Sequence, residues 1–172
     1  QALWGDFDKD GDLDLFVAVN NSNSAFANSK YYTQNVDHTF TETTATAIGN
    51  ISMTTVDAVV GDYDGDGDLD IFIAGNVDNN KLLQNDGTGK FTDVALSAGV
   101  AGNSAAKTYG AEFADIDSDG DVDLTISGQG GWAGKVYKNN GAGVFTVSQN
   151  FTTYTGNGNL VDWDKDGDLD FV

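Results

Sequence analysis

The stretch Asp62-Tyr63-Asp64-Gly65-Asp66-Gly67-Asp68-Leu69-Asp70 decides the fold of this chain. Aspartate fills every odd position, and carboxylates packed this densely repel one another unless a cation lies among them. Calcium suits such a site because it takes six to eight oxygen ligands at about 2.3–2.6 Å. Leu69 and Ile71 then begin an apolar alternating run. The loop is therefore expected to lead into a β-strand and not into a helix.

The expected roles of these residues follow from the loop's likeness to an EF-hand calcium loop. Carboxylates at positions one, three and five can turn inward, position seven can offer its backbone carbonyl, and Gly67 permits the sharp turn between them. An EF-hand closes with a glutamate at position twelve, but that position is Ile73 here. The closing carboxylate is therefore expected to be Asp70, at position nine. The ligands expected before it are Asp62, Asp64, Asp66 and, through its carbonyl, Asp68.

The same nine-residue pattern occurs four times. We call residues 6–14, 62–70, 115–123 and 162–170 the first to fourth acidic loops; each has glycine at position six and leucine or valine at position eight. Four copies in one register favour bound metal, about four calcium ions, over solvated acidic turns. The repeat length is roughly 50 residues, which is the length of a four-stranded propeller blade.

Each repeat reads as strand, acidic loop, strand, polar loop, strand, glycine turn and strand. The strands expected in the second repeat are 54–61, 69–74, 81–84 and 90–94. Those expected in the third are 108–114, 122–127, 135–138 and 144–148. Residues 85–89 and 139–143, which we call the glycine turns, precede the outer strands and place glycines where a positive φ is needed.

These patterns predict one all-β domain over residues 1–172, with no long helix. Its units are β-propeller blades of four antiparallel strands each. The blades are expected at about 1–50, 51–104 and 105–155, with part of a fourth at 156–172.

Composition narrows the class of partner. The formal net charge is -19, and the acidic loops hold 20 of the 27 acidic residues, so most of the acidity is expected metal-ligand chemistry. This charge argues against nucleic acid and anionic membranes as partners, and no run is long and apolar enough for direct membrane insertion. No cysteine occurs. Asp-rich sites of low affinity suit millimolar calcium, which predicts an extracellular or cell-surface location.

The loops and turns resemble those of the FG-GAP repeat family, also called VCBS repeats. The acidic loops match its Asp-x-Asp-x-Asp-Gly-Asp-x-Asp pattern, and residues 85–91 match a second signature, Asn-Asp-Gly-x-Gly-x-Phe. The family is best known from the β-propeller of integrin alpha subunits and from secreted bacterial and fungal proteins. The resemblance covers almost the whole chain and implies that each calcium loop joins the first and second strands of a blade.

The resemblance also implies the ligand set, with side chains from positions one, three, five and nine and a carbonyl from position seven. The implied ligands are Asp6, Asp8, Asp10, Asp12 and Asp14; Asp62, Asp64, Asp66, Asp68 and Asp70; Asp115, Asp117, Asp119, Asp121 and Asp123; and Asp162, Asp164, Asp166, Asp168 and Asp170. The family usually closes a ring of about seven blades, whereas three and a half are present here. We therefore expect part of a larger ring, or an assembly in which neighbouring copies cover the open ends.

Residues outside the loops offer little chemistry. His38, the single histidine, is expected to be a solvated turn residue, and neither a triad motif nor a spaced pair of acids marks a catalytic site. Trp4 and Trp163 align with apolar residues of the other repeats, so Trp4 is expected in the core and Trp163 in an apolar slot beside the metal. Trp132 lies in a glycine-rich loop, where it either stacks on a sugar or a partner side chain or folds back onto its blade.

The leading functional prediction is a non-catalytic extracellular module for adhesion or for recognition of a protein or glycan, with structural calcium. Two alternatives stay open. One is a structural subunit that assembles into rings or filaments through its open blade ends. The other is the scaffold of a secreted carbohydrate-active enzyme whose catalytic groups lie elsewhere. The expected partners are a protein or glycan ligand, or further copies of the chain.

Overall fold

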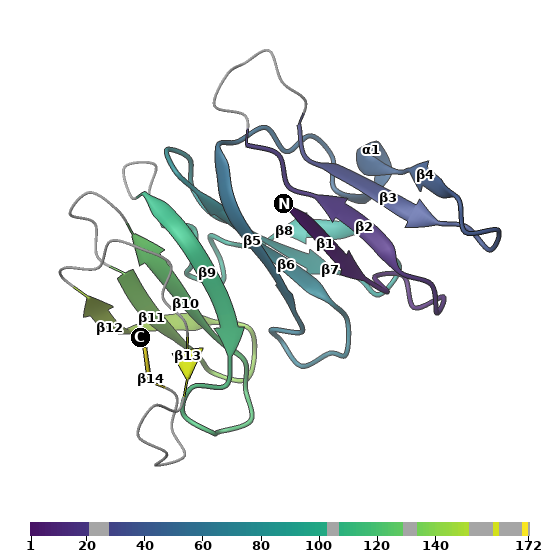
Figure 1. Ribbon diagram of the computed structural model, residues 1–172. Coiled ribbons are helices and arrows are strands. Elements are labelled where there is room, and N and C mark those ends of the chain that lie inside the picture. The colour runs from purple at the N-terminus through teal and green to yellow at the C-terminus, as the bar shows by residue number, and fades with distance from the viewer. Residues whose placement is uncertain (21–27, 103–106, 129–133, 152–159, 162–169, 172) are drawn as a thin grey trace.

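A computed structural model describes residues 1–20, 28–102, 107–128, 134–151, 160–161 and 170–171. These residues form three four-stranded antiparallel sheets, one two-stranded pair and one short helix, α1 (Thr44–Ala47). The prediction of an all-β fold built from blades of four antiparallel strands is confirmed. Figure 1 shows the three sheets side by side in a row. Closure of the blades into a ring stays a prediction.

Each strand of a sheet pairs with the next strand along the chain. Blade 1 contains β1 (Ala2–Gly5), β2 (Asp14–Val17), β3 (Lys30–Gln34) and β4 (Phe40–Glu42). Blade 2 contains β5 (Thr55–Gly61), β6 (Asp70–Gly75), β7 (Lys81–Asn85) and β8 (Phe91–Asp93). Blade 3 contains β9 (Thr108–Ala114), β10 (Asp123–Gly128), β11 (Gly134–Asn139) and β12 (Phe145–Phe151). The remaining pair is β13 (Leu160–Val161) with β14 (Asp170–Phe171).

The hydrophobic cores lie between blades. On β6, Ile71 and Ile73 belong to the core between blades 1 and 2, whereas Phe72 and Ala74 belong to the core between blades 2 and 3. All four are fully buried. Successive strand residues point to opposite faces of a sheet, so this strand is apolar on both faces. Burying one large apolar side chain stabilises the fold by about 1.5–3 kcal/mol, and contacts between blades therefore hold the molecule together.

The expectation that Trp4 lies in the core is wrong, because this residue is 52% exposed. Trp4 has the same position in blade 1 as Val60 has in blade 2, because Trp4 pairs with Leu15 as Val60 pairs with Ile71. Val60 packs onto the core between blades 1 and 2. No sheet of the described residues covers the equivalent face of blade 1, and Trp4 therefore points outward.

Two further apolar residues share this exposure. Leu13 is 54% exposed and Phe40 is 41% exposed, although their equivalents in blade 2, Leu69 and Phe91, pack onto the preceding blade. The rings of Trp4 and Phe40 meet edge to face, with 5.9 Å between their centroids. We call Trp4, Leu13 and Phe40 the open face of blade 1.

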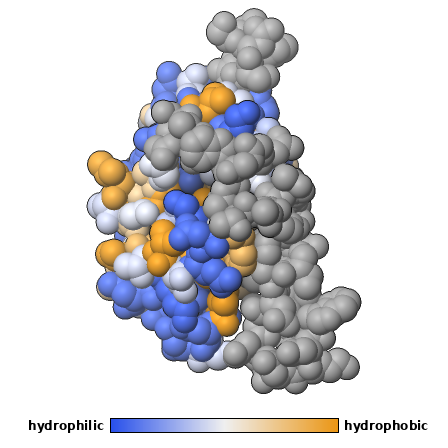
Figure 2. All heavy atoms as spheres, turned by 90° about the vertical axis from the view of Figure 1, so that its left-hand side faces the viewer, coloured by the Kyte–Doolittle hydropathy of each residue, from blue (hydrophilic) through white to orange (hydrophobic). Residues whose placement is uncertain are grey.

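Blade 3 lies at the other end of the row of three sheets (Figure 1). Figure 2 views the molecule from the side of blade 3 and shows hydrophobic residues in small separate groups among hydrophilic ones. Val144 and Val147 are the exposed large hydrophobic residues in the described part of this blade.

In the part of the chain that the structure describes, no helix has the length and apolar character needed to cross a membrane.

Candidate metal centre

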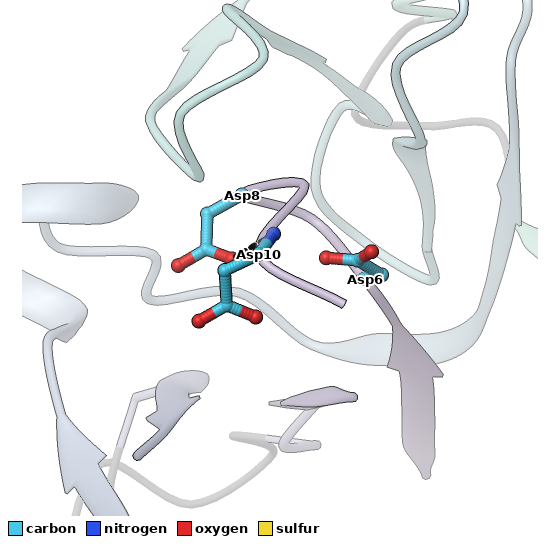
Figure 3. Close-up of side chains that lie close together, drawn as sticks. All are labelled: Asp6, Asp8 and Asp10. Atoms are coloured by element: carbon cyan, nitrogen blue, oxygen red, sulfur yellow. Dashed lines mark hydrogen bonds between the residues drawn. The ribbon is translucent and has the colours of Figure 1, made fainter. Parts of the chain in front are cut away.

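The first three acidic loops lie along one edge of the row of blades, each between the first and second strands of its blade (Figure 1). In the first loop, carboxylate oxygens of Asp6, Asp8 and Asp10 lie within 4.8 Å of one another. Figure 3 shows the Asp6 carboxylate directed toward the other two side chains. The equivalent group in the second loop consists of Asp62, Asp64 and Asp66. Positions one, three and five thus come together in both loops.

Glycine at position six shapes each loop. The φ angles are 93° at Gly11, 85° at Gly67 and 96° at Gly120, in the left-handed region where glycine is favoured. The amide of each glycine donates a hydrogen bond to Oδ2 of the aspartate at position one. These bonds join Gly11 to Asp6 at 3.2 Å, Gly67 to Asp62 at 3.0 Å and Gly120 to Asp115 at 3.0 Å. The sharp turn predicted at this position is therefore present in all three loops.

The aspartates at position nine are fully buried in all three loops. In the second loop, Oδ1 of Asp70 accepts a hydrogen bond from the amide of Asn85 at 2.8 Å, and Oδ2 accepts one from the amide of Tyr63 at 3.3 Å. Burial raises the pKa of Asp70 to about 7. Its equivalent in the third loop, Asp123, joins Asp115 and Asp117 in a group of close carboxylates. Position nine thus fixes the base of each loop, and in the third loop it also faces the other carboxylates.

The first loop holds an acceptor that lacks a partner. Oδ1 of Asp6 is buried and accepts no hydrogen bond from the described residues, which is costly for a carboxylate. Burial, followed by the charges of Asp14 and Asp10, raises the pKa of Asp8. A cation among these groups would satisfy the orphaned oxygen and offset the repulsion. The donor set consists of hard oxygens, and it fits a hard divalent cation.

Lys9 links the first loop to the second. Its ammonium forms an ion pair with Oδ1 of Asp68, at position seven of the next loop. Lys9 has a φ of 60°, which is uncommon for a residue with a side chain, and the sequence pattern gave no sign of this contact. Gly65 takes the place of Lys9 in the second loop, and a hollow of about 340 Å³ lies there between the second and third loops.

The first residue of each glycine turn joins its blade to the acidic loop of the preceding blade. Nδ2 of Asn85 donates to the carbonyl of Phe7 at 2.7 Å and to that of Leu69 at 3.2 Å. Asn139 repeats both bonds, to Tyr63 at 2.6 Å and to Val122 at 2.9 Å. The acceptors are position two of the preceding loop and position eight of the blade's own loop.

The last residue of each glycine turn lies against the same preceding loop. A Cβ atom at Gly143 would lie 2.8 Å from Cε2 of Tyr63 and 3.1 Å from Cβ of Asp64. A Cβ atom at Gly89 would lie 3.0 Å from the Tyr31 hydroxyl and 3.3 Å from Cβ of Asp8. The sequence accounted for these glycines only through their positive φ. The structure adds that a side chain at Gly143 would force a neighbour to shift, and that one at Gly89 would make tight contacts.

Blade 1 departs from this arrangement. Gln34 is the residue of blade 1 that is equivalent to Asn85. Its amide donates to Oδ1 of Asp14, as the amide of Asn85 donates to Oδ1 of Asp70. Four residues later, His38 has a φ of 63° and is exposed, so the expectation of an exposed turn residue is confirmed. A blade that preceded blade 1 in the register of blades 1 and 2 would meet the Cβ of His38.

Part of the predicted site lies outside the described residues. This applies to Trp132, to Trp163 and to most of the fourth loop, with the predicted ligands Asp162, Asp164, Asp166 and Asp168. Asp170 begins β14, where only the backbone pairing with β13 is described. The roles assigned to these residues stay predictions.

Four-stranded antiparallel blades, each with an acidic loop between its first two strands, define a repeat module of the β-propeller type. A family model described as FG-GAP-like repeat matches the chain at residues 6–73 and 62–126. The chain therefore belongs to the FG-GAP-like repeat family. A search of curated proteins found no match to it.

Proposed function

We propose that this chain is a calcium-stabilised, non-catalytic β-propeller module of the cell exterior that recognises a protein or a glycan. The observation that supports calcium most directly is the repeated grouping of carboxylates at the same edge of successive blades, together with the unpartnered Asp6 oxygen. The extracellular assignment is supported by the family, whose repeats are typical of extracellular proteins.

The contacts around the loops give calcium a structural role in this proposal. The turns of blades 2 and 3 pack on the acidic loops of the preceding blades through Asn85, Gly89, Asn139 and Gly143. A cation that fixes a loop therefore also fixes the surface on which the next blade rests. No catalytic group is needed for this role.

Asp66→Ala tests the proposal. At a calcium concentration about ten times the dissociation constant, one site stabilises the folded state by about 1.4 kcal/mol. We expect the substitution to lower the free energy of unfolding by about that amount in calcium, since Asp66 belongs to the carboxylate group of the second loop. In chelator we expect a change within about 0.5 kcal/mol. Denaturant unfolding under both conditions measures the difference.

Asp66→Asn serves as a companion variant. The amide of Asp68 donates to Oδ1 of Asp66 at 2.8 Å, and asparagine keeps an acceptor for this bond while it removes the charge. A loss confined to calcium in both variants supports a metal ligand. An equal loss in calcium and in chelator contradicts the role of Asp66 in metal binding.

The open face of blade 1 supports a second candidate function, self-assembly. Trp4, Leu13 and Phe40 together expose an apolar surface of the kind that in blade 2 covers a neighbouring blade. A second copy of the chain is the partner that we propose for it. In the register of blades 1 and 2, the Cβ of His38 would lie in tight contact with the preceding blade, since a Cβ at the equivalent Gly89 would lie 3.0 Å from the Tyr31 hydroxyl and 3.3 Å from Cβ of Asp8.

Light scattering on a sizing column tests this candidate. We expect wild-type protein in calcium to elute as an assembly, and the double variant Trp4→Ser, Phe40→Ser to elute at the mass of a single chain, because the variant removes the aromatic contact surface. Val147→Ser changes an exposed residue of blade 3 and is expected to leave the mass of the assembly unchanged. A wild-type chain that elutes as a monomer in calcium rules out self-assembly under those conditions.

A further inference from the structure

The three described loops differ in what holds the carboxylate at position three. The residue that precedes the first position of the turn is Thr33 in blade 1, Gln84 in blade 2 and Lys138 in blade 3. The equivalence is fixed by the residue that follows each one, whose amide donates to the aspartate at position nine of its own blade at 2.8–2.9 Å.

These three side chains differ in the contact that they make with the acidic loop. The side-chain amide of Gln84, which carries no charge, donates a hydrogen bond from Nε2 to Oδ2 of Asp64 at 2.6 Å. The ammonium of Lys138 forms an ion pair with Oδ2 of Asp117. Thr33 turns away and bonds to the Thr43 hydroxyl at 3.0 Å. Position three is therefore paired with a positive charge in the third loop, and with no cationic group in the described contacts of the other two.

A cation that binds in the third loop lies close to the ammonium of Lys138. It either displaces Lys138 from Asp117, which breaks the ion pair, or it binds beside a like charge, which is unfavourable. The third loop also differs in its grouping, since Asp123 and not Asp119 lies close to Asp115 and Asp117. Both observations distinguish the third loop from the first and second. The ammonium of Lys9 also contacts the second loop, but it pairs with the side chain of Asp68 at position seven, where the expected ligand is the backbone carbonyl and not the carboxylate.

We propose that the acidic loops bind calcium with unequal affinity and that Lys138 makes the third loop the weakest of the three. This inference rests on the proposed calcium binding. At limiting calcium the first and second loops fill, and the third fills only as the concentration rises. The occupancy of the third loop would thus change with the calcium concentration. The first loop, on which blade 2 rests, would already be filled.

The position-six glycines allow each loop to be followed separately. The amides of Gly11, Gly67 and Gly120 each donate to an aspartate of their own loop, so their backbone NMR resonances report on those loops one by one. Calcium is titrated into wild-type protein at fixed ionic strength, and the midpoint is read at each glycine. We expect the highest midpoint at Gly120.

Three variants test the assignment to Lys138. Lys138→Gln copies blade 2 and is expected to lower the Gly120 midpoint about tenfold, with Gly11 and Gly67 unchanged. Gln84→Lys copies blade 3 and is expected to raise the Gly67 midpoint by a similar factor. Lys135→Gln removes the same charge from the same strand, where the Lys135 ammonium lies 5.7 Å from the centre of the Tyr137 ring, and is expected to leave the Gly120 midpoint unchanged.

The outcomes separate this inference from the proposed function. If the Gly120 midpoint responds to calcium but does not change in Lys138→Gln, the role of Lys138 is wrong while calcium binding stands. If Gly120 titrates at lower calcium than Gly11 and Gly67 in wild-type protein, the ranking is wrong. If none of the three glycines responds to calcium, the proposed calcium binding fails together with the ranking.

Discussion

Replacing Asn85 by leucine is expected to lower the free energy of unfolding by about 3 kcal/mol, because two carbonyl groups, in one buried and one partly buried hydrogen bond, each lose their side-chain donor. Nδ2 of Asn85 donates to the carbonyls of Phe7 and Leu69, and Asn85 itself is only 3% exposed. Leucine has a similar volume but donates no hydrogen bond. Denaturant unfolding at constant calcium measures the loss.

The same substitution at Asn139 is expected to have a similar effect, since that residue makes the equivalent bonds one blade further on. Asn79→Leu is the matched control, because Asn79 is exposed and such changes usually stay within about 0.5 kcal/mol. A loss below about 1 kcal/mol at both Asn85 and Asn139 would show that these bonds between blades contribute little.

The substitution at Asn85 is also expected to weaken calcium binding at the first loop. Phe7 lies between Asp6 and Asp8, and its carbonyl is fixed by Asn85. Losing that bond frees the backbone that places both carboxylates. The Gly11 midpoint should therefore rise in Asn85→Leu. The Gly120 midpoint should stay unchanged, because Nδ2 of Asn85 donates to the first and second loops.

Gly143→Ala is expected to cost about 3 kcal/mol, through a left-handed backbone angle and an overpacked contact. The φ of Gly143 is 70°, and a Cβ there would lie 2.8 Å from Cε2 of Tyr63 and 3.1 Å from Cβ of Asp64. Since both neighbours belong to the second acidic loop, the contact between blades 2 and 3 has to open to admit the methyl group.

Gly49→Ala separates the two contributions. Gly49 has a φ of 64°, and a Cβ there would meet nothing within 4 Å, so alanine is expected to cost only about 1 kcal/mol through the backbone angle. Thermal and denaturant unfolding of both variants give the comparison. Equal losses in the free energy of unfolding would mean that the glycine turn needs its positive φ. They would also mean that the close approach to the preceding loop does not contribute to stability.

The sequence by itself determined the features that depend on local pattern. Glycine at position six of each acidic loop indicated a positive φ, because residues with a Cβ avoid that region. Alternation of apolar residues after Leu69 indicated a strand. These signals lie within a few residues of one another, and the first three loops repeat them in one register, so the blades and the grouped carboxylates could be predicted.

Only the tertiary structure decided the contacts between blades. Trp4 has the same pattern as Val60, yet it is exposed because the described residues place no sheet on its side of blade 1. The bond from Asn85 to Phe7 and the ion pair from Lys9 to Asp68 join repeats that are tens of residues apart, and no local spacing encodes them. A local pattern fixes which way a backbone turns, whereas the neighbour that a side chain meets depends on how whole blades pack.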